Sequence, residues 1–65
     1  MEEFGDRLFK LRVEKGYTQM QLAERSGIQQ GMISAYESNA VQPTAKRIEW
    51  FCKALGVTAT ELLGF

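Results

Sequence analysis

The chain has 65 residues, with eight Lys and Arg against eight Asp and Glu, no His and one Cys. A chain of this length forms one small domain, here over residues 1–65, with short connections. The single Cys52 excludes an internal disulfide, and one Cys without His excludes a Cys/His zinc site within the chain. No apolar run approaches the roughly 20 residues of a membrane span and no signal peptide opens the chain, so we expect a cytoplasmic protein. The zero net charge gives no basic footprint for nucleic acid.

Two helices are predicted in the first part of the chain. From Glu2 to Lys15, apolar residues recur at helical spacing, and Gly16 is typical of the position just after a helix end. Thr18 and Gln21 form the pattern of a capping box, in which each side chain bonds the backbone of the other. This second helix ends at Ser26, before Gly27.

Three more helices follow in the second part of the chain. One spans Gln29 to Glu37, and Asn39 just behind it tolerates left-handed backbone. The next begins after Thr44 and ends before Gly56, and a second capping box, 58–61, begins a short fifth helix. Strand patterns are poor, so the sequence predicts an all-α domain of five short helices. The expected core residues are Leu8, Leu11, Leu22, Ile33, Ile48, Phe51, Leu55 and Leu62.

Residues 18–37 have the pattern of a helix-turn-helix. A small residue, Ala23, lets the two helices approach, and Gly27 supplies the positive φ that the turn needs. The remaining positions of the pattern are apolar and face a shared core: Leu22, Ile28, Ile33 and Tyr36. This unit is therefore the central motif of the domain.

Linked motifs along nearly the whole chain resemble the helix-turn-helix domains of lambdoid phage repressors and Cro proteins. The motifs are Phe4 to Leu8, Leu11-Arg12, Gly16 to Gln19, Leu22 to Glu24, Ile33 to Glu37 with Asn39 and Pro43, Ala54 to Val57, and Leu62-Leu63. The resemblance implies a compact five-helix domain that binds a palindromic operator in double-stranded DNA as a homodimer. It favours a transcriptional repressor with helix 29–37 in the major groove.

The resemblance places base-reading residues on the exposed side of this third helix: Gln29, Gln30, Gly31, Ser34 and Ala35. Gln30 is the first candidate because its amide can pair with adenine in bidentate fashion. Ser34 is a second reader, and Ala35 suits a thymine methyl. The alternative is that Gln29 and Gln30 are plain surface amides. Gln29 is a weak N-cap, and Gly31 costs helix stability.

The resemblance also implies contacts that set register rather than sequence. The expected phosphate-binding residues are Thr18, Gln19, Asn39, Gln42, Thr44 and Lys46. Arg12 and Glu37 are expected to form a buried or half-buried structural ion pair between the first and third helices. No Lys or Arg lies between Gln29 and Gln42. We therefore expect few ionic phosphate contacts and a shallow salt dependence.

Exposed aromatic residues favour a homodimer contact on the last two helices, formed by Trp50, Ala59, Leu63 and Phe65. Alternatively, Trp50 folds back over the fifth helix. The second candidate function is a helix-turn-helix used as a protein-binding module, as in an antitoxin, which Phe9 and Trp50 favour. An enzyme is disfavoured because His is absent and Cys52 lies on the core stripe. We expect no cofactor, no metal and no small-molecule effector domain.

Overall fold

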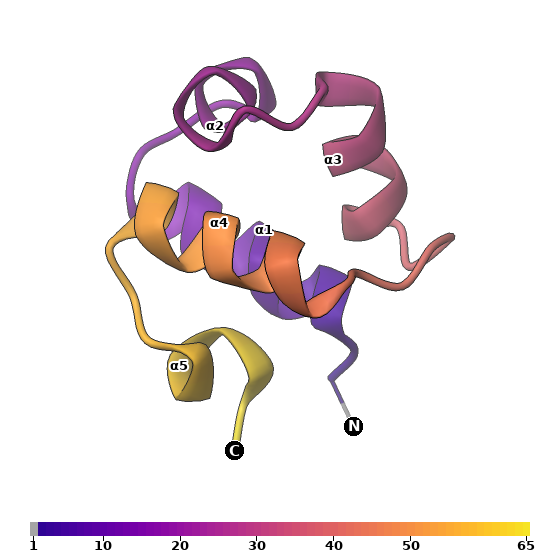
Figure 1. The fold of residues 1–65 in the computed structure, drawn as a ribbon, viewed down its shortest axis with the longest axis vertical. Coiled ribbons are helices and arrows are strands. Elements are labelled where there is room, and N and C mark those ends of the chain that lie inside the picture. The colour runs from indigo at the N-terminus through magenta and orange to yellow at the C-terminus, as the bar shows by residue number, and fades with distance from the viewer. Residues whose placement is uncertain (1) are drawn as a thin grey trace.

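The computed structural model describes residues 2–65, which form five α-helices and no strand. In chain order these are α1 (Phe4–Glu14), α2 (Gln19–Ser26), α3 (Gln30–Glu37), α4 (Ala45–Leu55) and α5 (Ala59–Leu63). Figure 1 shows α1 and α4 crossing the middle of the molecule, with α2 and α3 on one side and α5 on the other. The predicted all-α fold is confirmed. Within the described part of the chain, no helix has the length and apolar character to cross a membrane.

The helix starts follow the predicted caps closely. The Thr18 hydroxyl accepts from the Gln21 N–H at 3.1 Å, while the Thr18 N–H donates to the Gln21 side-chain oxygen at 2.9 Å. The Thr44 hydroxyl likewise accepts from a backbone N–H of α4. Three boundaries differ from expectation: α1 begins at Phe4 and ends at Glu14, and α3 begins at Gln30. Gln29 is the N-cap of α3, and its side chain makes no capping hydrogen bond.

A single core joins all five helices. Its buried members are Leu8, Leu22, Ile28, Ile33, Tyr36, Phe51, Leu55 and Leu62. Leu11 and Ile48, which the sequence predicted as core residues, are only half-buried and pack against its edge. A domain this small has too little interior to enclose every apolar residue of its helices.

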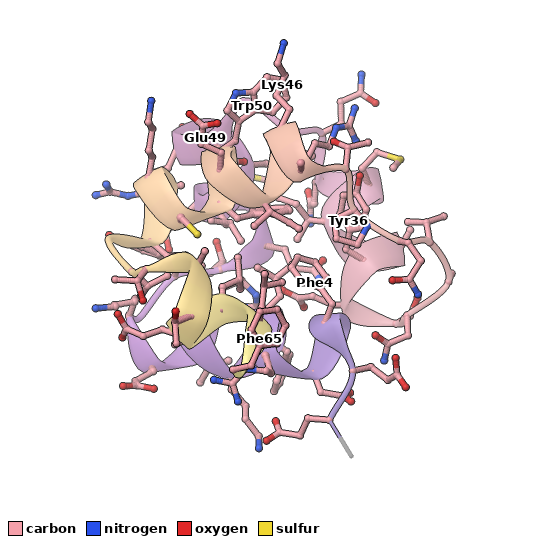
Figure 2. The ribbon with its side chains drawn as sticks, turned by 60° about the horizontal axis from the view of Figure 1, so that its bottom comes forward. Phe4, Tyr36, Lys46, Glu49, Trp50 and Phe65 are labelled. Atoms are coloured by element: carbon pink, nitrogen blue, oxygen red, sulfur yellow. The ribbon has the colours of Figure 1, made fainter. Side chains whose placement is uncertain are left out.

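The start of α1 lies directly on the end of α3. A Cβ on Gly5 would stand 2.1 Å from the Tyr36 carbonyl oxygen, so only glycine permits this approach. Next to it, the Phe4 ring meets the Tyr36 ring edge-on at 6.1 Å, and Tyr36 meets Phe51 at 5.7 Å. Figure 2 shows Phe4 beside Tyr36. This contact fixes α3 relative to α1 and α4.

Candidate nucleic-acid interface

The outer side of α3 is polar and carries no bulky side chain at Gly31. Gln29, Gln30, Gly31 and Ser34 are exposed, and Ala35 is half-buried. A Cβ on Gly31 would meet nothing within 4 Å. The first N–H groups of a helix have no acceptor within it. The outer side of α3 therefore offers two amide side chains and free backbone N–H groups at its start, and the Ser34 hydroxyl further along, with little steric bulk around them.

The predicted ion pair between α1 and α3 is present. Arg12 Nε donates to Glu37 Oε2 at 2.6 Å, and Arg12 Nη2 donates to Glu37 Oε1 at 3.1 Å. The two side chains are only 11% and 7% exposed. Arg12 Nη1 also donates to the Tyr17 carbonyl at 2.8 Å. The pair thus ties α1 both to the end of α3 and to the segment that leads into α2.

Gln19, the first residue of α2, belongs to this same cluster. Its side-chain nitrogen donates to Glu37 Oε1 at 3.0 Å, a contact that the sequence did not indicate. An amide nitrogen carries two N–H groups, so one remains for another acceptor. The bond to Glu37 therefore fixes the orientation of the Gln19 amide without using all of its donors. Thr18 is exposed beside it.

Asn39, between α3 and α4, also has internal partners that sequence reasoning missed. Its backbone is left-handed, with φ +65°, as the sequence predicted. Its Oδ1 accepts from the Gly5 N–H at 2.8 Å, and its Nδ2 donates to Asp6 at 3.4 Å. The glycine in the first turn of α1 was the available signal, because glycine is unfavourable in a helix unless the backbone needs the space.

The first turn of α4 carries two cations. Lys46 is exposed, and Arg47 is half-buried with its Nη1 donating to the Tyr36 hydroxyl at 2.9 Å. Within residues 2–65, neither cation lies within 4.0 Å of a carboxylate oxygen. The helix dipole disfavours positive charge in a first turn, so this end of α4 attracts anions. The sequence reading named Lys46 and missed Arg47, although the absence of acidic residues from this turn was visible. Gln42 and Thr44 are exposed nearby in the chain.

The residues predicted for a dimer contact do not form one patch. Trp50 is 39% exposed and Phe65 86% exposed, while Ala59 is exposed and Leu63 half-buried. Figure 2 shows Trp50 with Lys46 and Glu49 on the side of α4 away from Phe65. The expectation that Trp50 and Phe65 are neighbours is wrong, because they leave the fold on different sides of α4. Trp50 does not fold over α5 either.

Cys52 is half-buried against the core. Burial raises the pKa of its thiol, and the nearby Glu49 and Glu61 carboxylates raise it further. The thiol is therefore protonated and weakly nucleophilic at neutral pH.

Comparison with known proteins identifies the family. A family model described as helix-turn-helix matches residues 8–62. The chain belongs to the helix-turn-helix family. The SPbeta prophage-derived uncharacterized HTH-type transcriptional regulator YonR of Bacillus subtilis (strain 168) is 37% identical over 60 residues, which are 92% of this chain and 56% of YonR. The HTH-type transcriptional activator BcrR of Enterococcus faecalis is 38% identical over 61 residues, which are 94% of this chain and 30% of BcrR.

A solved structure shows the same fold. The wild-type restriction-modification controller protein C.Esp1396I superposes with a TM-score of 0.83 at 34% identity, covering 91% of this chain and 77% of that chain. The chain spans about half the length of YonR and under a third of BcrR. Both of these relatives are described as HTH-type transcriptional regulators, and the part of each that this chain matches is the helix-turn-helix domain.

Proposed function

We propose that this helix-turn-helix chain is a cytoplasmic protein that binds a palindromic operator in double-stranded DNA as a homodimer and represses transcription. The observation that carries the proposal is the exposed, polar outer side of α3. The helices before and after it in the chain, α2 and α4, also have exposed polar residues at their starts. This arrangement suits a helix in the major groove with phosphate contacts at its flanks.

Base reading is assigned to the exposed side of α3. The Gln30 amide bonds the N6 and N7 atoms of adenine, which is worth about 1–3 kcal/mol of discrimination against the wrong base. Ser34 bonds a base edge less selectively, and Ala35 contacts a thymine methyl. Gly31 lets the helix backbone approach the base edges, since nothing occupies the space beside it. Gln29 lies at the edge of this contact.

Phosphate binding is assigned to three polar sites around α3. The first is the start of α2, with Thr18 and the side-chain N–H of Gln19 that Glu37 does not use. The second is Asn39, through the N–H that Asp6 does not use. The third is the stretch from Gln42 to Arg47, where the N-terminal end of α4 favours an anion. Arg47 joins the predicted set because it is a cation without a carboxylate partner in residues 2–65.

The salt dependence follows from these cations. Lys46 and Arg47 of one protomer neutralise about two phosphates, so a dimer neutralises about four. The slope of log affinity against log salt is then about −4. A slope of −8 or steeper contradicts this assignment.

Trp50 is the proposed anchor of the homodimer, because a half-exposed tryptophan on a small domain is typical of an interface. Trp50→Glu lowers the mass measured by sedimentation from dimer to monomer. Phe65→Glu is the matched control, because Phe65 lies on another side of α4. If the mass of Trp50→Glu is that of the unaltered chain, Trp50 is not in the interface.

Two substitutions test the reading of DNA. Gln30→Ala relaxes base preference at one position in each half-site and leaves the others unchanged. Gln42→Ala weakens binding to all sequences to a similar degree, because phosphate contacts carry no sequence information. If Gln30→Ala preserves the full base preference, Gln30 is not a reader.

A second candidate function rests on exposed apolar residues of α1. Phe9 and Val13 are 49% and 52% exposed, and their spacing places them on one side of the helix. Such a pair suits contact with another protein, as expected for an antitoxin-like module. This function is favoured over DNA binding if the chain selects no DNA sequence and Phe9→Ser abolishes capture of a partner.

A further inference from the structure

The end of α3 and the loop behind it are fastened to the first turn of α1. The Asn39 side chain accepts a hydrogen bond from the Gly5 N–H and donates one to Asp6. Asp6 also accepts from the Glu3 N–H at 3.0 Å through its other oxygen. Asn39 thus caps α1 from a distant segment, and Asp6 holds the capping amide in place.

This fastening fixes the direction in which the chain leaves α3. Asn39 is the one non-glycine residue with positive φ in residues 2–65, and it begins the path toward Gln42 and α4. The backbone at Gly5 packs so closely on this segment that an added Cβ would lie 2.8 Å from the Glu37 carbonyl oxygen and 2.5 Å from Asn39 Oδ1. The α1 turn, the end of α3 and the start of the loop form one close contact.

We propose that Asp6 is a positioning residue for DNA binding, which sets through Asn39 where residues 40–47 lie relative to the reading helix α3. This inference rests on the proposed function. Asp6 acts through Asn39, without touching DNA itself. Its carboxylate is negative, so electrostatics alone predict that removing it tightens DNA binding. Positioning predicts the opposite sign, and that difference makes the proposal testable.

Two variants break the contact in different ways. Asp6→Ala removes the acceptor for the Asn39 amide, and Asn39→Gly removes the amide while keeping a residue that accepts positive φ. Glu14→Ala is the matched control, because it removes one exposed carboxylate from the other end of α1. Affinity for the selected operator falls about two- to tenfold in Asp6→Ala, the range expected for the one hydrogen bond to Asn39. It falls at least as far in Asn39→Gly, which also loses the bond to the Gly5 N–H. Glu14→Ala binds as well as the unaltered chain or slightly better.

Operators with single neutral methylphosphonates separate positioning from a loss of stability. In the unaltered protein, substitution of a phosphate beside residues 40–47 or beside Gln19 weakens binding. In Asp6→Ala, methylphosphonates beside residues 40–47 no longer weaken binding, whereas those beside Gln19 still do. Asn39→Gly behaves in the same way and also loses the contact of its own side chain with phosphate. Equal loss at both sets of phosphates, or an Asp6→Ala affinity equal to that of Glu14→Ala, overturns the proposal.

Amide hydrogen exchange on the free proteins gives a readout that needs no DNA. Exchange speeds up at Gly5 and in residues 40–47 of both variants, while the amides of α2 keep their rates. Unchanged rates in residues 40–47 overturn the positioning role. A chain that selects no operator but shows this local change refutes the proposed function alone.

Discussion

Removing Glu37 tests how much the cluster between α1, α2 and α3 stabilises the fold. Glu37→Leu leaves the Arg12 guanidinium with the Tyr17 carbonyl as its remaining hydrogen-bond acceptor, and frees the Gln19 amide. Breaking a buried ion pair on one side costs about 3–5 kcal/mol. Arg12 and Glu37 are 11% and 7% exposed, so we expect about 3 kcal/mol, at the lower end of this range.

The expected loss is large for this domain. A 65-residue protein has an unfolding free energy of about 3–10 kcal/mol. Glu37→Leu therefore removes about 30% of it or more. The double variant Arg12→Met/Glu37→Leu replaces both charges by apolar side chains, and we expect its stability to lie within about 1 kcal/mol of the unaltered chain.

Urea denaturation followed by circular dichroism measures these differences. The control is Lys53→Ala, which breaks the ion pair between Lys53 and Glu49, whose side chains are 77% and 67% exposed. We expect it to cost less than about 0.5 kcal/mol. A Glu37→Leu cost no greater than that of Lys53→Ala would refute the reasoning. A double variant that loses the sum of its single substitutions would refute it as well.

Four further predictions concern single positions. Gly5→Ala costs about 3 kcal/mol or more in urea denaturation, because its Cβ would lie 2.1 Å from the Tyr36 carbonyl oxygen; a loss under 1 kcal/mol argues against the close contact. Gly31→Ala raises stability by up to about 1 kcal/mol, since the site is open and helical; a loss of stability contradicts this. Thr58→Ala costs about 1 kcal/mol and lowers Tm by about 4–8 °C, because its hydroxyl caps α5; an unchanged Tm speaks against the cap. The pKa of the Cys52 thiol is raised in the folded protein, so the free energy of unfolding falls as pH rises above the pKa of the unfolded thiol, because the unfolded chain then ionises first. Iodoacetamide is expected to react slowly with Cys52 in the folded protein. A fast reaction at pH 8 contradicts the assignment.

Local signals carried the prediction of the helices. Thr18, Thr44 and Thr58 mark their helix starts because the caps involve residues three positions apart. Gly27 and Gly56 mark helix ends with positive φ. Such patterns depend on neighbours in the chain, so one sequence suffices to read them.

Contacts between distant segments were predicted less well. The resemblance supplied the pairing of Arg12 with Glu37, but nothing local indicated that Gln19 joins them. Gly5 signalled a close approach to α1 without identifying Asn39 as its partner. These bonds depend on how α1 packs across α3, which periodicity does not define. Trp50 and Phe65 were wrongly placed together for the same reason, because helical spacing does not say on which side of α4 the chain end lies.

Selection from random DNA duplexes tests the central claim most directly. The purified chain is incubated with a random duplex library at low salt, at protein concentrations well above micromolar, and bound DNA is sequenced after several rounds. We predict enrichment of two inverted half-sites spaced for a dimer, with their centres about one helical turn apart. No enriched half-site under these conditions would contradict DNA reading by α3.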